Sequence, residues 1–351
     1  MLLIDRQPKT QNDRTWCFWA KTPGLFGSVV SKEWAHIWFH SPLHSARIPL
    51  SPYRYYMIRS QDFYAYALDH LAQSPNVQIE YGHIQGIQDA ENGAHVQVNG
   101  QIRVGQWVFN SLPEEKLFLR PKVQYLKQHF MGWMVQTNKP VFDPATATFM
   151  DFRIEQEGQT RFMYLLPTSA YQSLVEFTVF SPDFLPVQEY EAQLRQYFLQ
   201  YLGLQANEYQ ILEEEFGVIP MADAPLKARG GKHVVHIGTR GGQTKASTGY
   251  TFVNIQKQSE KIVAALLQKG VPFPHPAPSR FRLYDRMLLN VLQKQRYPAR
   301  DIFARMFARH PIARVLRFLD GESRFDEEIK IMAKMPSLPF LRAGLDLLSK
   351  M

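Results

Sequence analysis

Residues 238–252 read GTRGGQTKASTGYTF, and this stretch decides the fold of the 351-residue chain. It follows a short apolar run at 234–237, typical of a buried strand, and precedes apolar residues at helical spacing over 252–266. Glycines let a backbone approach a ligand, and the free N–H groups of a helix start favour an anion or an electron-rich ring edge. We predict a strand, a glycine-dense loop and a helix that starts at Ser247-Thr248-Gly249. From the residues alone, the loop is either a generic anion site or a structural turn.

The segments around this stretch indicate a mixed α/β (α+β) chain of three parts. Residues 1–115 and 225–271 form one discontinuous, Rossmann-like nucleotide-binding domain, because the strand, loop and helix close an α/β part after a long insertion. The insertion, 116–224, has the alternating pattern of a β-rich substrate domain. A proline-rich linker at 272–278 then leads into a helical region at 279–351.

The first residues, Met1-Leu2-Leu3-Ile4-Asp5, read as a short apolar strand that ends in a carboxylate. In a dinucleotide-binding βαβ unit the second strand ends this way, with the carboxylate on the ribose hydroxyls. The glycine-rich turn expected about 20 residues earlier is absent from the sequence. Two interpretations stay open. One is an ordinary buried strand before a polar loop, and the other is a Rossmann-like domain that lacks its first βα unit, so that the chain begins one unit late.

Composition narrows the class of protein. Hydrophobic residues make up 45% and charged residues 21% of the chain, which excludes a disordered tail or a collagen-like fibre. The single cysteine, Cys17, excludes an internal disulfide framework and a cysteine-based metal site within one chain, and it fits a reducing, cytoplasmic-side location. No apolar run approaches the roughly 18–20 residues of a membrane-spanning helix. We expect no metal site.

Two acidic residues in the β-rich segment are candidates for proton transfer. The alternation of residues 174–180 puts Glu176 on the same strand face as Thr178 and Phe180. A carboxyl group in this company is desolvated, so its pKa rises and it holds a proton near neutral pH. Asp151, among apolar neighbours, shows the same pattern. The alternative is an edge strand with Glu176 in water.

The helical region combines apolar faces with many arginines, within a chain whose net charge is +8. Two predicted helix faces are apolar: Phe281, Tyr284, Met287 and Leu288 on one, and Ile302, Phe303, Met306 and Phe307 on the other. Basic, aromatic helices of this kind lie in a membrane interface when anionic lipid attracts them. The alternative, which the pattern slightly favours, is amphipathic helices packed on the body of the protein. No nucleic-acid-binding motif accompanies the charge, so we expect no nucleic-acid partner.

With these features in place, the chain resembles the bacterial lycopene β-cyclase family of FAD-dependent lycopene cyclases. The matching segments are DRTWCF at 13–18, Asp151 after Met150, RFMYLLP at 161–167, LVEFT at 174–178, EEFGVIP at 214–220 and all of 238–252. Asn290 and residues 335–339 resemble the helical tail of the family. The resemblance covers nearly the whole chain.

The resemblance implies a peripheral membrane flavoprotein on the cytoplasmic side, with the p-hydroxybenzoate-hydroxylase-like fold. Such enzymes cyclise the linear ψ-ends of lycopene to β-rings, toward γ- and β-carotene, with no net redox change. They need reduced FAD, with NAD(P)H as the reductant. Glu176 matches the essential acidic position of the family, and Asp151 is the second catalytic candidate. The positions that match cofactor contacts are Asp5, Arg14, Gly238, Thr239, Gly241, Gly242, Thr248 and Gly249.

The missing glycine-rich turn leaves the pyrophosphate site incomplete and predicts weak flavin binding. Three functions stay open. The first is an FAD-dependent lycopene β-cyclase acting on lycopene or a related acyclic carotenoid. The second is a membrane-associated, FAD-dependent isoprenoid reductase or monooxygenase. The third is a truncated flavin-fold protein that binds carotenoid or membrane without catalysis.

Overall fold

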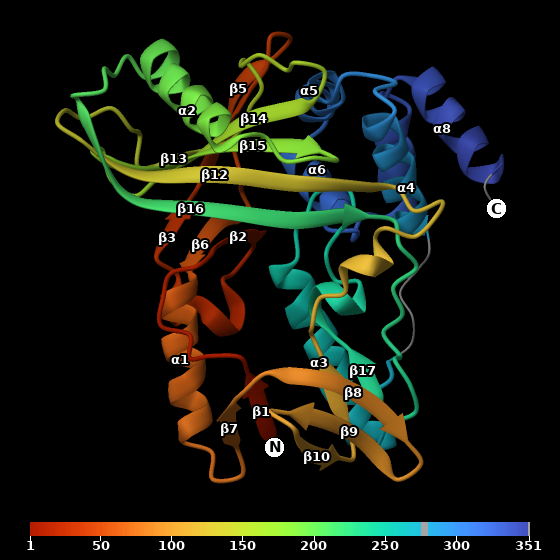
Figure 1. Cartoon of the computed structure of the whole chain (residues 1–351). Helices are drawn as coiled ribbons and strands as arrows, with labels where there is room; N and C mark the ends of the chain where they lie inside the picture. Colours follow the sequence, from red (N-terminus) through yellow and green to blue (C-terminus); the bar gives the residue numbers. More distant parts are fainter. Residues whose placement is uncertain (275–279, 350–351) are drawn as a thin grey trace.

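The computed structural model describes residues 1–274 and 280–349, and a large mixed sheet forms its upper half (Figure 1). Within these residues its strands are hydrogen-bonded in the order β16-β12-β15-β14-β13-β4-β5. Their bounds are β16 (Tyr209–Ala222), β12 (Tyr125–Thr137), β15 (Gln172–Ser181), β14 (Thr160–Pro167), β13 (Thr146–Asp151), β4 (His36–His40) and β5 (Ser45–Pro49). All neighbours are antiparallel except β13 and β4. Two strands that precede the predicted insertion in the sequence, β4 and β5, therefore extend its sheet.

The lower half in Figure 1 is built from smaller sheets. Two are parallel pairs, β1 (Leu2–Asp5) with β7 (Gln78–Tyr81), and β11 (Val108–Asn110) with β17 (Val234–His236). Two are antiparallel sheets of three strands. The first has the order β2 (Thr15–Ala20), β6 (Arg54–Arg59), β3 (Lys32–Trp34). The second has the order β10 (Gln101–Gly105), β9 (Gly93–Val98), β8 (Ile84–Ala90). In the described part of the chain, no strand is hydrogen-bonded between the two parallel pairs. The mixed α/β class is confirmed.

Helices cover both faces of the large sheet. On one face, α2 (Val187–Tyr201) packs its apolar side against alternate residues of β12 and β15, among them Trp133 and Phe177. The bounds of the tail helices are α4 (Arg280–Gln293), α5 (Ala299–Arg309), α6 (Ile312–Leu319), α7 (Phe325–Met332) and α8 (Ser337–Ser349). The first three pack on the other face of the sheet, and the last two contact these: α7 lies against α6 and α8 against α4. The lower half carries α1 (Ser60–Ala72) and α3 (Phe252–Lys269), and short 3-10 helices span Gly24–Val29, Glu115–Leu117 and Gly238–Gly241.

The apolar face of α5 packs on the body of the protein. Phe303 and Phe307 are buried in one core with Phe39 and Phe149 of the large sheet, and Ile302 and Met306 are buried too. For this helix the packing interpretation holds, because the sheet supplies the apolar partner. Across residues 1–274 and 280–349, no helix combines the length and apolar character that crossing a bilayer requires.

The helix after the 238–252 loop starts later than predicted. Gly249 has a φ of +75°, a left-handed conformation that no helix contains, and Thr251 is the non-helical residue before the first turn. The prediction of a start at Ser247 was wrong, and α3 begins at Phe252. Much of the predicted linker, 275–278, lies outside the described residues, as does residue 279.

Candidate active site

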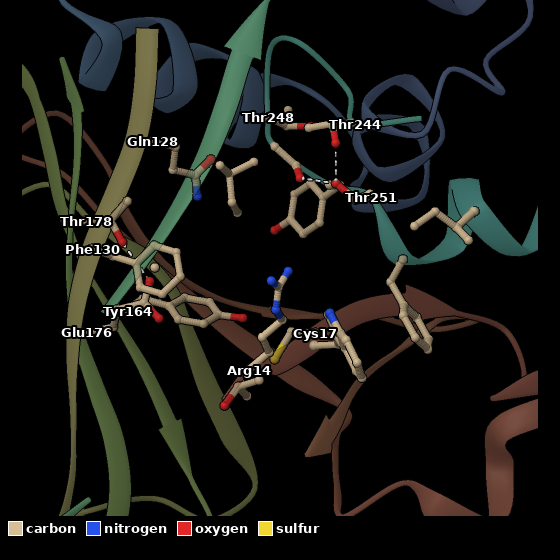
Figure 2. Close-up of a pocket in the computed structure, with 18 of the residues that line it drawn as sticks. Arg14, Cys17, Gln128, Phe130, Tyr164, Glu176, Thr178, Thr244, Thr248 and Thr251 are labelled. Atoms are coloured by element: carbon tan, nitrogen blue, oxygen red, sulfur yellow. Dashed lines mark hydrogen bonds between the residues drawn. The ribbon is translucent and has the colours of Figure 1, made fainter. Parts of the chain in front are cut away.

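A cavity of about 860 Å³ lies between the large sheet and the 238–252 loop. Its walls come from β2, β12, β15 and β16 and from the loop ahead of α3 (Figure 2). Many of the lining side chains are aromatic, among them Trp16, Phe130, Phe149, Phe162, Tyr164 and Tyr250. A cavity of this size and character accepts part of a long apolar ligand, and its ring faces attract positive charge.

Glu176 lies on β15, an interior strand between β12 and β14, and it lines this cavity (Figure 2). Only 9% of the residue is exposed. The Thr178 hydroxyl donates a hydrogen bond of 2.8 Å to Glu176 Oε1. Burial, and next the negative charge of Glu215, raise the pKa of the Glu176 carboxyl well above its usual range. The carboxyl is desolvated as expected, and the alternative of an edge strand in water does not hold.

The sequence alone does not single out Glu215 on β16, the second carboxyl that lines the cavity. It ends a run of three glutamates, 213–215, which reads as a solvated strand. The Thr15 hydroxyl donates a hydrogen bond of 3.0 Å to Glu215 Oε2. Burial raises the pKa of Glu215, and its carboxyl is hydrogen-bonded to that of Glu176. Only the long-range pairing of β12 with both strands brings these groups together.

Several buried titratable side chains beside this pair are neutral. Burial raises the pKa of the Cys17 thiol to about 12. The hydroxyls of Tyr55 and Tyr164 share a hydrogen bond, and burial raises the pKa of both well above the usual range. In the described chain neither Glu176 nor Glu215 forms an ion pair with a basic side chain. The local environment therefore disfavours two charged carboxylates.

The loop at 238–252 forms the opposite side of the cavity, where Figure 2 shows Thr248 facing Gln128. A Cβ at Gly249 would lie 2.4 Å from Gln128 Oε1, and the φ of +75° at this residue favours glycine where the loop approaches β12. The buried Thr248 hydroxyl and Gln128 Oε1 have no hydrogen-bond partner among the described residues. Buried polar atoms are normally paired, so these two predict a ligand with polar ring edges. A flavin ring fits this side of the cavity.

A tail helix holds this loop in place. Lys245 Nζ lies 2.7 Å from Asp285 Oδ1 of α4, with side chains only 11% and 13% exposed. The Ser247 hydroxyl donates a hydrogen bond of 2.6 Å to the same oxygen. The loop and the tail, which are distant from each other in the sequence, are thus joined by a buried ion pair.

Apart from Asp5, the predicted cofactor residues fall into two groups. Arg14, Thr239, Thr248 and Gly249 line the cavity, and Figure 2 shows the Arg14 side chain directed into it. The other three loop glycines lie in the turn behind the cavity wall: Gly238, Gly241 and Gly242. A Cβ on the second of these would lie 2.4 Å from the carbonyl oxygen of residue 236, so it shapes the turn.

Two predicted acidic residues lie away from the cavity. Asp5 ends β1, where its carboxylate accepts a hydrogen bond from the Arg6 N–H and lies 3.6 Å from Lys9 Nζ. Asp151 is fully buried on the α2 side of the sheet, where Arg153 Nε donates a hydrogen bond of 2.9 Å and the Tyr197 hydroxyl one of 2.7 Å. Neither residue lines the cavity that contains Glu176. No cluster of three metal-binding side chains occurs in the described segments.

Solved structures with the same fold include a reductase-like protein and two monooxygenases, one of them described as flavin-dependent. A geranylgeranyl bacteriochlorophyll reductase-like protein from Thermoplasma acidophilum has a TM-score of 0.60 at 12% identity, over 99% of this chain and 92% of that one. The p-nitrophenol 4-monooxygenase PnpA from Pseudomonas putida has a TM-score of 0.52 at 11% identity, over 98% and 90%. The flavin-dependent monooxygenase PieE, solved with FAD and substrate, has a TM-score of 0.55 at 13% identity, over 99% and 67%. At these identities the likeness shows the fold alone.

Sequence comparison identifies the family. Among curated proteins, none matches the chain. The family model described as lycopene cyclase protein matches residues 1–345, which include both carboxyls of the cavity and the whole 238–252 loop. The chain therefore belongs to the lycopene cyclase family.

Proposed function

We propose that the protein is a lycopene β-cyclase, which converts the linear ψ-ends of lycopene to β-rings, toward γ- and β-carotene. One observation carries this proposal: Glu176 is a desolvated carboxyl with a raised pKa, held on an interior strand and facing an aromatic cavity. Family membership supports a carotenoid substrate.

A carboxyl that keeps its proton at neutral pH is a general acid. In the proposed reaction, Glu176 transfers its proton to a carbon of the terminal double bond, which leaves a carbocation. The next double bond supplies the electron pair for the ring-closing carbon–carbon bond, and loss of a ring proton restores a double bond. Proton gain and loss balance, so the product is an isomer of the substrate. The aromatic walls stabilise the cation and exclude water that would trap it.

We further propose that the cofactor is reduced FAD, with NAD(P)H as the reductant. When bound, the reduced flavin supplies an electron-rich ring that stabilises developing positive charge. The unpaired Thr248 hydroxyl and the close backbone at Gly249 fit the polar edge of such a ring. The Arg14 guanidinium, directed into the same cavity, is available to a negatively charged part of the cofactor.

We propose that the protein binds the cytoplasmic-side membrane surface through its tail. Four leucines, more than half exposed, form one face of α8: Leu338, Leu341, Leu345 and Leu348. Residues 280–349 hold fourteen Lys and Arg side chains against eight Asp and Glu, so the tail complements anionic lipid. An apolar helix face within a basic region is typical of interfacial binding.

Co-sedimentation with vesicles tests the membrane proposal. We expect binding to vesicles of phosphatidylcholine and phosphatidylglycerol at low salt, and weaker binding to phosphatidylcholine alone. The double variant Leu341→Ser/Leu345→Ser should lose binding. Equal recovery of wild type and variant in the supernatant with anionic vesicles would contradict this role of α8.

Product analysis tests the proposed reaction. Lycopene in membranes is incubated with the protein, FAD and NAD(P)H without oxygen, and the carotenoids are separated. We expect γ- and β-carotene from the wild type and unchanged lycopene with Glu176→Gln. The control Glu214→Gln changes an exposed glutamate and should stay active.

The amount of reductant used separates the alternatives. A cyclase consumes NAD(P)H only to reduce the flavin, far below one equivalent per ring. One equivalent per product would instead indicate a reductase or monooxygenase. Carotenoid that binds but stays unchanged, with flavin bound and reduced, would indicate a binding protein without catalysis.

A further inference from the structure

A glycine separates the two carboxyls of the cavity. In the large sheet, Gly132 of β12 lies opposite Glu176 of β15 on one side and opposite Glu215 of β16 on the other. Side chains of residues in register across neighbouring strands point to the same face of a sheet. The two glutamates therefore project to one face from the strands on either side of β12.

The missing side chain at Gly132 is what lets the two carboxyls meet. A Cβ there would lie 3.0 Å from Glu215 Cγ and 3.1 Å from Leu174 Cδ1. Side chains from both neighbouring strands thus lean over the glycine and fill the space that any other residue would occupy. Strands on either side of a third lie at twice the spacing of neighbouring strands, so long glutamate side chains need this gap to form a hydrogen bond.

The surroundings of the pair favour one shared proton. Each carboxyl accepts one hydroxyl hydrogen bond, Glu176 from Thr178 and Glu215 from Thr15. No basic side chain in the described residues is ion-paired with either. Two neighbouring carboxylates without a counter-ion repel each other in this desolvated setting, so one of them keeps its proton.

The geometry also indicates which carboxyl carries the charge. Glu176 is buried on an interior strand, whereas Glu215 is only partly buried on β16, which is the edge strand of the sheet. The better solvated group retains the negative charge at lower cost. This assignment agrees with the electrostatic effect of Glu215 on its partner, because the charge of Glu215 raises the pKa of Glu176.

We propose that Glu215 is a positioning residue for the acid: it holds the negative charge of a one-proton pair and so keeps the proton on Glu176. This inference rests on the proposed cyclase function, in which Glu176 is the donor. The pair gives one proton to the terminal carbon of the polyene and receives one from the closed ring, so it ends each turnover with one proton. No electron transfer is involved.

The other titratable or charged groups that face the pair leave this assignment intact. Four of them are neutral because burial raises the pKa of each: Cys17 on β2, Tyr55 on β6, Tyr164 on β14 and Tyr250 in the loop ahead of α3. Glu213 on β16 adds negative charge that also raises the pKa of Glu215, but its side chain is about half exposed. The Arg14 side chain is 67% exposed, so water screens its charge.

The test is the pH dependence of Glu215→Gln, with Glu214→Gln as the matched control on the exposed side of the same strand. Wild-type turnover should fall on the alkaline side as Glu176 loses its proton. In Glu215→Gln this fall should move to lower pH by about one unit, with turnover retained below it. Glu215→Asp keeps the charge and should restore the wild-type profile. The control should match the wild type throughout.

A second measurement follows the proton without any substrate. A protonated carboxyl has an infrared carbonyl band, and the band that disappears in Glu176→Gln is assigned to Glu176. The pH at which half of this band is lost is then compared between the wild type and Glu215→Gln. A lower midpoint supports the pair, and an unchanged midpoint overturns it. If the wild type makes no cyclic carotenoid but the midpoint still falls, the pair stands and the proposed reaction fails.

Discussion

Replacing Asp285 by Asn tests whether the tail holds the 238–252 loop in place. The carboxylate lies 2.7 Å from Lys245 Nζ and accepts a hydrogen bond of 2.6 Å from the Ser247 hydroxyl. Asn keeps the shape and one acceptor oxygen but removes the charge. The Lys245 ammonium, with its side chain 11% exposed, is then left without its counter-charge.

The expected loss follows from the burial of the pair. Removing one partner of a buried ion pair costs about 3–5 kcal/mol, because the remaining charge is desolvated and uncompensated. Both side chains retain slight solvent contact, so we expect the lower end, about 3 kcal/mol. The unfolding entropy is about 2.1 cal/mol/K per residue. For a chain of this length, a loss of about 3 kcal/mol in unfolding free energy therefore lowers Tm by about 4 °C.

Urea denaturation and flavin binding measure the effect. Glu322→Gln is the control, since it removes an exposed partner of Lys257 and should cost less than about 1 kcal/mol. The double variant Lys245→Met/Asp285→Asn should recover part of the loss, because no unpaired charge remains. FAD affinity, followed by quenching of flavin fluorescence, should fall with Asp285→Asn alone. If Asp285→Asn costs no more than Glu322→Gln, the ion pair does not hold the loop.

Three further substitutions test other parts of the structure. Gly249→Ala places a Cβ at a φ of +75° and 2.4 Å from Gln128 Oε1. It should lower the unfolding free energy by about 1–2 kcal/mol and weaken FAD binding. Unchanged values of both would refute the close approach. Asp151→Asn should lower the unfolding free energy by about 2 kcal/mol, because its partner Arg153 loses a charge-assisted hydrogen bond. Turnover per folded molecule should stay unchanged. Loss of turnover with the fold intact would instead indicate a catalytic role for Asp151. Burial raises the pKa of Asp320 to about 6, so its charge destabilises the fold above pH 6 and not below pH 4. Asp320→Asn should therefore raise the unfolding free energy by up to about 3 kcal/mol at pH 7 and leave it unchanged at pH 4. An equal effect at both pH values would contradict this cause.

Local patterns in the sequence predict the parts of the site that depend on neighbours along the chain. The alternation in 174–180 places Val175 and Phe177 in the core with α2 and Glu176 on the opposite face, and the structure agrees because β15 is regular and interior. The glycine-dense loop predicts a backbone that approaches a ligand, and this stays a prediction; the close approach that the structure shows at Gly249 is to Gln128 of β12. The helix start was missed because a left-handed glycine interrupts the chain directly after Ser247 and Thr248.

Long-range pairing determines the rest, and no local pattern shows it. Glu215 meets Glu176 only because β12 pairs with both β15 and β16, and Gly132 is far from Glu215 in the sequence. Asp151 has the same apolar sequence context as Glu176, yet its partner Tyr197 lies on α2, on the other face of the sheet. Alternation gives the two faces of a strand, but which face borders a cavity depends on the elements that pack there.

The position of the acid on an interior strand has an energetic reason. A raised pKa needs desolvation that persists, and a carboxyl on a loop would relax toward water. β15 is hydrogen-bonded to β12 and β14 along its length, so the backbone at Glu176 cannot shift toward bulk solvent without breaking the sheet. Its neutral form is inexpensive to bury because Thr178 and Glu215 satisfy its hydrogen bonds, whereas a doubly charged pair would cost several kcal/mol. In the proposed reaction, the desolvation that keeps the proton on Glu176 would also keep water from the carbocation, so one feature of the fold would serve both proton donation and protection of the intermediate.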